Sequence, residues 1–340
     1  MKVLVTGASG RVGANLVKAL LEGGHEVRAH VFPGDAGRAD KLDGFDVEVV
    51  RGDFRDLEGF RPVVRGTEVI YHIGAAMRGP FDNVSFFDTN VVGTRNVIES
   101  ALQERLDLHR FVYACTDAIY PPAPGRLTTE EMGMNRPKGM YSFSKWLGEH
   151  VALYYHEQHK IPVVSFRFAY VIGAGEILQK DYFPMFWLSH WVATFKRRKD
   201  PQGIQTFEAL QELWEGDERL VVCRNPDGQP HQMHLVDVRD LVQGLLLGME
   251  RPEAVGEAFT LPGPCPTSWE EAVPYLSERL GIPYVEATVP GSIRRAFDLS
   301  KARERLGYAP EHDLASMVDL ALEMERGGEI EVVPTGEPYA

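Results

Sequence analysis

The sequence has few cysteines, a deficit of positive charge and no long apolar run. Its three cysteines are far apart and show no metal-ligand spacing, which argues against a disulfide framework, predicts no metal site and is typical of the reducing cytoplasm: Cys115, Cys223 and Cys265. Against 49 Asp and Glu there are 36 Lys and Arg, and the resulting net charge of −13 disfavours nucleic acid and anionic lipid as partners. No apolar run approaches the ~18 residues of a membrane span.

The chain of 340 residues is long enough for one large domain or two modest ones, and 44% of it is hydrophobic. Its first half alternates short apolar segments with segments of helical periodicity, such as those at 11–24 and 90–106. The expected strands are 2–6, 25–31, 45–53, 66–76, 109–116 and 161–168. This alternation predicts an α/β fold, in which a doubly wound parallel sheet of the Rossmann type carries helices on both faces.

The alternation stops at about Ile177 and resumes with a strand-to-helix unit at 234–250. Four further helices are expected, at 182–200, 207–220, 267–281 and 298–310. We therefore expect a Rossmann domain of residues 1–175, to which 234–260 return, and a smaller, mostly helical C-terminal lobe for substrate, made of 176–233 and 261–340. Aromatic residues of this lobe are expected to be mostly core, with the remainder lining a pocket: Tyr182, Phe183, Phe186, Trp187, Trp191 and Trp214.

A glycine-rich loop follows the first expected strand, in the segment VLVTGASGRVG. Gly7, Gly10 and Gly13 would let the backbone turn tightly, and the helix that starts here would direct its free N–H groups and positive dipole end at a pyrophosphate. The strand-turn-helix context predicts a dinucleotide site, with Arg11 and Val12 of the same loop among its residues.

The end of the second strand offers no acid for a ribose 2′-hydroxyl, because Val31 and Phe32 stand there. Arginines nearby could meet a 2′-phosphate, which favours NADP slightly over NAD: Arg11, Arg28 and Arg38. Asp35 is an alternative partner for the ribose. Asp53, after the third strand, is placed either to accept a hydrogen bond from the adenine amino group or to cap a helix.

Tyr141 and Lys145 are separated by four residues in PKGMYSFSK, at the start of a helical pattern, and therefore share one helix face. The ammonium favours the phenolate form of the tyrosine, which could then exchange a proton with an alcohol as hydride moves to or from a nicotinamide. A surface pair is the alternative interpretation. Thr116, at the end of the fifth strand, would place a hydroxyl in the same cleft and hydrogen-bond the reacting oxygen.

These segments together resemble the extended short-chain dehydrogenase/reductase family, also called the NAD-dependent epimerase/dehydratase family. The similarity covers nearly the whole chain, through motifs in this order: TGASGRVG, GDFRD, YHIGAA, NVVGTRNVIESA, FVYACTDAIY, PKGMYSFSK, VVSFRFAYVIGAG, LVDVRDLV and DLSKARERLGYAP. The resemblance implies a catalytic trio of Thr116, Tyr141 and Lys145. It also implies a homodimer formed through helices near 88–105 and 140–158.

The same resemblance assigns residues to the cofactor. Gly7, Gly10 and Gly13 would line the pyrophosphate, Asp53 the adenine, and Lys145 the nicotinamide ribose. Residues 72–76, which include Gly74 and Ala75, would pass beside the cofactor, and Asn90 would lie behind the active site.

Several positions depart from the family pattern. Dehydratases of nucleotide sugars carry Thr-Asp-Glu where this chain has Thr116, Asp117 and Ala118, so 4,6-dehydration is disfavoured. Epimerases carry a proline and an asparagine where Phe168 and Tyr170 stand here. Epimerases also tend to carry an arginine that binds the sugar-nucleotide phosphates, and Met233 lies near the matching place in this chain. The neighbouring histidines, His231 and His234, are interpreted as packing or surface residues.

From these residues we expect an NAD(P)-dependent oxidoreductase that interconverts a secondary alcohol and a ketone of a small-molecule substrate, with Tyr141 as acid/base. A redox-neutral nucleotide-sugar epimerase with tightly bound NAD would use the same trio and is the first alternative. A non-catalytic NAD(P)-sensing protein on the same fold is the second.

Overall fold

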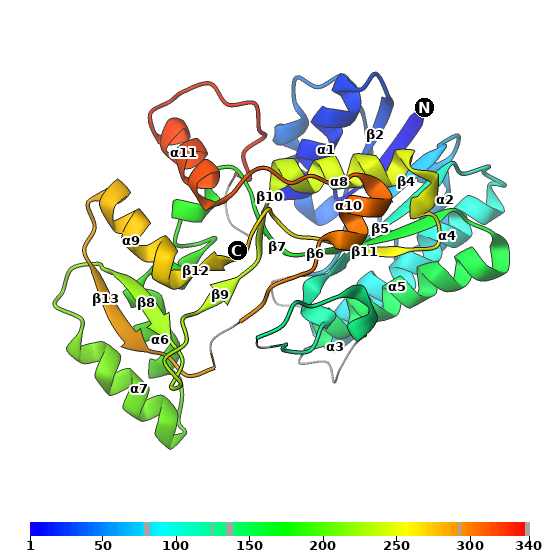
Figure 1. Cartoon of the computed structure of the whole chain (residues 1–340). Coiled ribbons are helices and arrows are strands. Elements are labelled where there is room, and N and C mark those ends of the chain that lie inside the picture. The colour runs from blue at the N-terminus through cyan, green and yellow to red at the C-terminus, as the bar shows by residue number, and fades with distance from the viewer. Residues whose placement is uncertain (78–81, 124, 134–138, 292–293, 337–340) are drawn as a thin grey trace.

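A seven-stranded parallel sheet forms the centre of the computed structural model, which describes residues 1–77, 82–123, 125–133, 139–291 and 294–336. Its strand order is β11-β6-β5-β4-β1-β2-β3 (Figure 1). The strands are β1 (Lys2–Thr6), β2 (Glu26–Val31), β3 (Glu48–Arg51), β4 (Val69–His72), β5 (Arg110–Thr116), β6 (Val163–Phe168) and β11 (Ala258–Leu261). Since β2 lies on one side of β1 and β4 on the other, the chain reverses direction there, and the carboxyl ends of these strands border a crevice.

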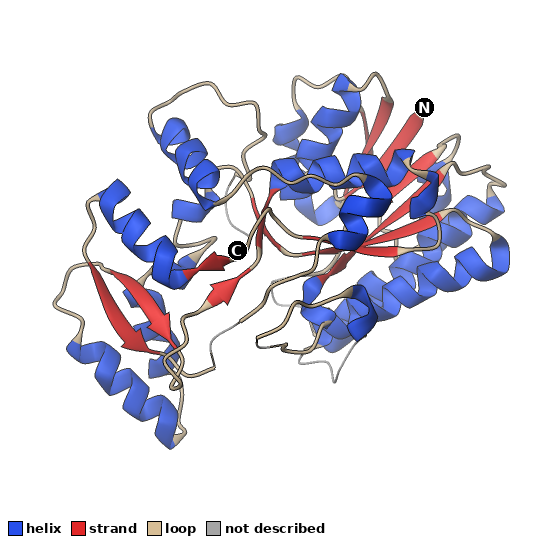
Figure 2. Ribbon diagram, in the orientation of Figure 1, coloured by secondary structure: helices blue, strands red, loops and turns tan. Residues whose placement is uncertain are grey.

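Helices cover both faces of this sheet (Figures 1 and 2). One face carries α1 (Arg11–Glu22) and α8 (Val238–Glu250), which pack on each other; the other carries α2 (Leu57–Val64), α4 (Gly93–Gln103) and α5 (Met140–His159). The predicted doubly wound parallel fold is confirmed. Between α2 and α4 the chain forms α3 (Asn83–Phe87) and one turn of π-helix, η2 (Asp88–Val92).

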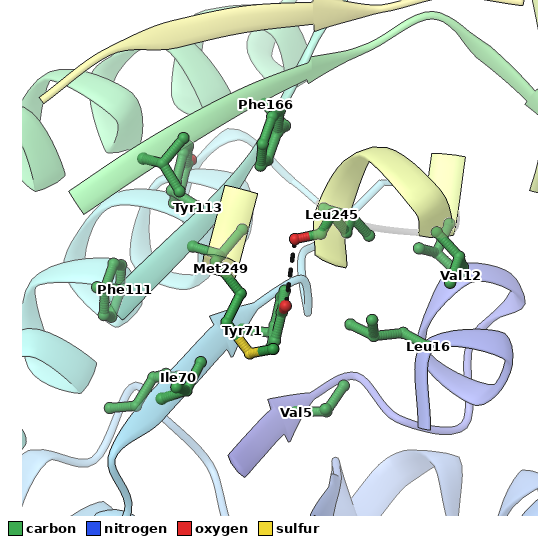
Figure 3. Close-up of a cluster of buried hydrophobic side chains, with 14 of the residues drawn as sticks. Val5, Val12, Leu16, Ile70, Tyr71, Phe111, Tyr113, Phe166, Leu245 and Met249 are labelled. Atoms are coloured by element: carbon green, nitrogen blue, oxygen red, sulfur yellow. Dashed lines mark hydrogen bonds between the residues drawn. The ribbon is translucent and has the colours of Figure 1, made fainter. Parts of the chain in front are cut away.

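The core lies between the sheet and these helices. Every residue of β5 is buried, as expected for a parallel strand that is covered on both faces. Figure 3 shows side chains of β1 and β4, such as Val5 and Tyr71, packing against α1 and α8, and the Tyr71 hydroxyl donates a hydrogen bond to the carbonyl oxygen of Leu245 at 3.2 Å. The carboxyl ends of the strands are thereby held by a closely packed interior.

A second hydrophobic cluster supports a smaller lobe built from α6 (Leu188–Lys196), α7 (Pro201–Glu212), α9 (Trp269–Leu280) and α11 (Leu314–Glu325). The lobe also contains a parallel pair, β8 (Leu220–Arg224) with β13 (Tyr284–Thr288), and an antiparallel pair, β9 (Gln232–Met233) with β12 (Thr267–Ser268). Its aromatic residues are largely core, since Tyr182, Phe183, Phe186 and Trp187 are all buried. A further pair, β7 (Tyr170–Ile172) with β10 (Leu235–Asp237), joins the lobe to the central sheet.

Parts of residues 261–340 pack elsewhere than the expected division places them. The helix α10 (Ser300–Leu306) and the side chains of Phe297 and Tyr308 belong to the main core, and the Tyr308 hydroxyl donates to the carbonyl oxygen of Pro262. Downstream of α11, Val332 also packs into that core. The apolar face of α10 has β11 and α8 as its neighbours, which is why this stretch leaves the smaller lobe.

Short helical turns connect these elements: η1 (Pro33–Leu42), η3 (Asp117–Ile119), η4 (Glu130–Met132), η5 (Glu176–Leu178), η6 (Pro184–Phe186) and η7 (Pro252–Ala254). No helix in the described ranges combines the length and the apolar character needed to cross a membrane. The same ranges contain no group of three or more His, Cys, Asp or Glu placed to hold a metal ion.

Candidate cofactor and catalytic site

The loop between β1 and α1 closely approaches the segment after β4. Gly7 has a φ of +67°, and a β-carbon there would lie 2.8 Å from the α-carbon of Gly74. A β-carbon on Gly13 would overlap the carbonyl oxygen of Gly7. The Thr6 hydroxyl accepts hydrogen bonds from the N–H groups of Ile73 and Gly74, at 3.1 and 3.0 Å. Glycine is required at these positions because any side chain would separate the two segments.

The first turn of α1 fits an anion. Gly10 is its N-cap, and among the described side chains none caps this end, so the N–H groups of the first turn remain available. Their partial positive charge suits a pyrophosphate. Val12 is buried and holds the helix to the core, while Ala75 is partly exposed beside Gly74. The cradle that the glycines form therefore fits a dinucleotide, in the place where the sequence predicted one.

Two of the arginines that favoured NADP are engaged elsewhere. Arg11 donates through Nε to the buried carboxylate of Glu176, and through Nη1 to the carbonyl oxygen of Val171, both at 2.7 Å. Arg28 is buried, paired with Glu48 and hydrogen-bonded to two backbone carbonyls near the end of α2. Since these guanidinium groups already have buried or partly buried partners, the expectation that Arg11 or Arg28 meets a 2′-phosphate is corrected.

Lys41 is a residue at this site that the sequence did not point to. Its ammonium donates to the carbonyl oxygen of Ser9 in the glycine loop, at 3.2 Å, and to that of Thr335. Burial and the nearby charge of Arg38 lower the pKa of Lys41. No spacing in the sequence signals this contact, because the two partners lie 32 and 294 residues away.

Asp53 is held by its neighbour. Both carboxylate oxygens accept hydrogen bonds from the Arg55 side chain, and one also accepts from the Arg55 backbone N–H at 2.9 Å. Burial opposes ionisation, but Arg55 outweighs it and lowers the pKa of Asp53. The helix-cap role considered for Asp53 belongs to Asp56, which accepts from the N–H of Gly59 at the start of α2. The side chain of Asp53 is 30% exposed, so an adenine could still approach it.

Thr116, Tyr141 and Lys145 lie on two elements that pack together. Thr116 ends β5, where its hydroxyl accepts from the N–H of Ala118 at 3.2 Å. Tyr141 is in the first turn of α5 and Lys145 in the next, so they share a helix face. The carbonyl oxygen of Lys145 accepts from the thiol of Cys115, the residue before Thr116, at 3.7 Å. The elements that carry the predicted trio, β5 and α5, therefore pack against each other.

Lys145 has an unusual environment for an ammonium group. It is 2% exposed, and its Nζ lies 4.5 Å from the centre of the Tyr113 ring. Burial lowers its pKa to about 8, against the opposing effects of Cys115 and Glu149. At neutral pH the group is therefore mostly charged but close to releasing its proton, as suits a lysine that interacts with a proton-transferring phenol.

Asn90 connects the cofactor segment to the catalytic helix. Its amide oxygen accepts from the N–H of Ala76, and its amide nitrogen donates to the carbonyl oxygen of Ala76 and to the hydroxyl of Ser144. Ser144 in turn donates to the carbonyl oxygen of Tyr141. Asn90 is 1% exposed, and its hydrogen bonds link the segment after β4 to the first turns of α5.

A buried ion pair lies one turn beyond Lys145. Glu149 accepts from Arg167 at 2.7 Å and from the Ser165 hydroxyl at 2.6 Å, and it is 0% exposed. Burial opposes its ionisation, but the hydrogen bonds and charge of Arg167 prevail and lower the pKa of Glu149. The sequence contained a signal for this residue, since Tyr141, Lys145 and Glu149 continue the same four-residue spacing.

A second missed pair borders Thr116. Asp117 accepts from Arg295 at 2.9 Å, and Arg295 also donates to the Asp117 carbonyl oxygen. Burial raises the pKa of Asp117, although the arginine opposes this effect. The side chains of Asp117 and Arg295 are 16% and 24% exposed, so the pair is only partly shielded from solvent.

The two histidines beside Met233 are packing residues. His231 lies edge-on to Trp191 and close to Trp269, and His234 is hydrogen-bonded to Gly263. Burial lowers the pKa of each to about 4, so both are neutral. This agrees with the interpretation made from sequence.

Comparison with known proteins adds the family. The model of the NAD dependent epimerase/dehydratase family matches residues 3–261. The chain belongs to this family. A short-chain dehydrogenase/reductase superfamily protein from Agrobacterium tumefaciens, solved with bound NAD, has a TM-score of 0.84 at 29% identity, and the match covers 96% of this chain and 98% of that one.

Curated relatives of this family member differ in activity. Sterol demethylase protein B of Methylococcus capsulatus is 36% identical over 44% of this chain and 45% of its own length. A dTDP-glucose 4,6-dehydratase of Streptomyces griseus is 27% identical over 92% of this chain and 90% of its own. The chain spans about half the length of the first curated relatives it matches. Others are named as a reductase and a dehydrogenase, so the family indicates an NAD-dependent enzyme without selecting one reaction.

Proposed function

We propose that this protein is an NAD(P)-dependent oxidoreductase that interconverts a secondary alcohol and a ketone. The observation that carries the proposal is the position of Tyr141 one helical turn before the buried Lys145, on a helix that packs against the strand ending in Thr116. These three residues lie on the same sheet edge as a glycine cradle that fits a dinucleotide.

A nicotinamide bound beside Gly7, Gly74 and Lys145 would supply the hydride chemistry, and the side chains would transfer the proton. Thr116 hydrogen-bonds the substrate oxygen and orients it. Tyr141 removes the hydroxyl proton when the alcohol is oxidised and returns a proton to the oxygen when the ketone is reduced. Lys145 stabilises the phenolate form of Tyr141 and hydrogen-bonds the nicotinamide ribose.

Residues of the cleft favour this reaction over dehydration. Ala118 stands where a dehydratase of the family carries the glutamate that removes a carbon-bound proton, and alanine has no group for that step. Asp117, the remaining acid at this strand end, is paired with Arg295. An epimerase would use the same trio, but Phe168 and Tyr170 replace residues that such enzymes carry after the sixth strand.

The proposal leaves two cofactors, NAD and NADP. The lack of a carboxylate at Val31 and Phe32 supports NADP. Because Arg11 and Arg28 have other partners, Arg38 is the remaining candidate for the 2′-phosphate. Arg38 lies near the glycine loop, since its charge lowers the pKa of Lys41, which donates to the Ser9 carbonyl oxygen. Fluorescence titration with NADH and NADPH decides the choice. If Arg38 meets the 2′-phosphate, Arg38→Gln weakens NADPH binding and spares NADH, whereas tighter binding of NADH than of NADPH by the unchanged protein would assign NAD.

We further propose a homodimer of the reducing cytoplasm. A mostly apolar groove lies on the outer face of α4 and α5 and includes η2; it is lined by Phe87, Val91, Arg95, Leu147, His150, Val151, Tyr154 and Tyr155. Phe87 and Tyr154 are 38% and 57% exposed, which is unusual for large apolar groups gathered on one face.

All three cysteines are free thiols, which suits a reducing compartment.

The first test identifies the nucleotide that the purified protein releases when it is denatured. Exchangeable cofactor, found as an empty protein that binds added NAD(P)H, supports the oxidoreductase. Near-stoichiometric NAD that leaves only on denaturation, together with epimerisation of a nucleotide sugar, would instead establish the redox-neutral alternative.

Tyr141→Phe tests the catalytic assignment on alcohols or ketones found active in a screen with both cofactors. We expect turnover to fall by a factor of about 10² to 10⁴, because the acid/base is lost. The NADH dissociation constant should stay within about twofold, since the ring remains. Tyr284→Phe on the exposed strand β13 is the matched control. Turnover unchanged by Tyr141→Phe would contradict the mechanism.

A further inference from the structure

Tyr113 contacts Lys145 at both its backbone and its charged end. The Tyr113 hydroxyl donates to the carbonyl oxygen of Lys145 at 3.0 Å, and the face of its ring lies 4.5 Å from the lysine Nζ. Tyr113 is 0% exposed on β5, in the packed core that Figure 3 shows, with Phe111 on the same strand and Phe166 on the neighbouring β6. A single rigid side chain thus lies under the whole length of the catalytic lysine.

The helix is adapted to this contact. A β-carbon at Gly148 would overlap the Tyr113 hydroxyl and would lie 2.5 Å from the carbonyl oxygen of Asn90. Glycine at 148 therefore lets α5 approach β5 closely enough for the hydroxyl to reach the carbonyl of Lys145. Any larger residue would displace either the helix or the tyrosine.

None of the other groups described around Lys145 can stabilise its ammonium charge in place of the Tyr113 ring. Cys115 is a neutral thiol, because burial raises its pKa well above the usual value, and His72 on β4 is neutral because burial lowers its pKa. Glu149 is negative but is already bonded to Arg167, which balances its charge. Tyr141, one turn earlier on α5, is the proposed proton carrier. Tyr113 itself stays a neutral phenol, since burial raises its pKa, so its ring keeps a negative face toward the ammonium.

We infer that Tyr113 is a positioning residue for the proposed reaction: its ring keeps the buried Lys145 ammonium charged, and its hydroxyl fixes the helix turn that carries this lysine. The inference rests on the proposed function for the role of Lys145 toward cofactor and Tyr141. A cation over an aromatic face is stabilised most when both are shielded from water, as they are here.

The test measures the titration of Lys145 directly, by NMR of protein labelled with ¹³C at lysine Cε, with Lys145→Met to assign the signal. In Tyr113→Leu we expect the midpoint of Lys145 to fall by about 0.5 to 1 pH unit, because the charged form loses the ring face. Tyr113→Phe keeps the ring and should restore the midpoint. An unchanged midpoint in a folded Tyr113→Leu protein overturns the inference.

A second series protects the test against loss of folding. Residue 113 is replaced by phenylalanine and by increasingly fluorinated phenylalanines, which keep the shape of the ring and weaken its negative face. The midpoint of Lys145 should fall stepwise with fluorination, and a flat series overturns the inference.

NADH titration between pH 6.5 and 9 separates this result from the proposed function. We expect the affinity of the unchanged protein to weaken above pH 8 and that of the fluorinated proteins to weaken at lower pH, in step with Lys145. If the lysine midpoint moves while NADH affinity does not, Tyr113 retains its effect on Lys145 and the cofactor role of Lys145 is wrong.

Discussion

At the scale of single residues, the partners of a side chain decide its chemistry. His234 accepts a hydrogen bond at Nδ1 from the N–H of Phe297, at 3.1 Å, so its Nε2 must carry the proton that is donated to the carbonyl oxygen of Gly263. A second proton would have to sit on Nδ1, facing another N–H group. Burial and this arrangement explain why its pKa is lowered from 6.5 to about 4.

His234 therefore makes stability depend on pH. Below pH 6.5 the unfolded chain binds a proton at His234 that the folded protein does not bind, so the contribution of His234 to the free energy of unfolding is constant above that pH and falls toward pH 4. The shift corresponds to a loss of about 2 kcal/mol between pH 7.5 and 5. Urea unfolding should show that the difference in the free energy of unfolding between the two pH values is smaller by this amount in His234→Gln. An unaltered difference between the two pH values in His234→Gln refutes the assignment.

Residue-level prediction from sequence succeeded where neighbours are local and failed where they are distant. Tyr141 and Lys145 share a helix face because four residues separate them, and any helix would bring them together. Arg11 looked available for a phosphate, but its partner Glu176 lies 165 residues away and no pattern in the loop reveals it. Lys41 was missed for the same reason.

At the scale of elements, the glycine loop couples a local turn to a tertiary contact. The loop, its strand and its helix were all predicted, because glycine spacing and apolar periodicity are properties of neighbouring residues. The reason for Gly13 emerges only in three dimensions, since its α-carbon lies against the carbonyl group of Gly7.

Gly13→Ala should abolish tight cofactor binding. The added methyl group would overlap the carbonyl oxygen of Gly7, and the loop must shift to relieve this contact. We expect NADH affinity to fall at least tenfold, measured by fluorescence titration, in a protein that remains folded by circular dichroism. Gly23→Ala, at the other end of α1, is the control, because its β-carbon meets its nearest neighbour only at 3.2 Å. Equal affinities for the two variants would show that the loop does not bind the cofactor.

The elements that sequence reasoning missed depend on distant pairing. No strand was predicted where β8 lies, and the helix expected at 207–220 starts earlier in the structure, since α7 begins at Pro201 with Asp200 as its cap. β13 alternates exposed and half-buried residues and becomes a strand only by pairing with β8. Edge pairs of this kind carry a weak local signal, because their stability comes from the partner strand.

At the scale of the whole molecule, contacts between distant parts of the chain close the site. Arg11 on α1 reaches Glu176, and Asp117 after β5 reaches Arg295. Asn15 exchanges two hydrogen bonds with the backbone of Val333, so the segment that leaves α11 returns to the helix of the glycine loop. These contacts connect the glycine loop and the end of β5 to distant parts of the chain, and none of them follows from local sequence.

In the proposed homodimer the outer face of α5 would contact a second subunit. The helix presents Tyr141 and Lys145 near its start and the exposed Tyr154 near its end, beside the apolar groove. In a dimer with two-fold symmetry each substitution on this face would enter the interface twice. Association would therefore bury the groove and hold both catalytic helices in place.

Analytical ultracentrifugation tests this arrangement. The unchanged protein should sediment at twice the monomer mass of 38.1 kDa, and Tyr154→Glu should shift it toward monomer, because two carboxylates would be buried against apolar surface. The monomeric variant should also lose activity, since α5 loses its outer support. Tyr284→Glu makes the same substitution at a 43% exposed tyrosine on β13, away from the groove, and should leave the mass in solution and the activity unaltered. If the unchanged protein stays monomeric at micromolar concentration, the proposed homodimer is wrong and α5 needs no second subunit to hold its position.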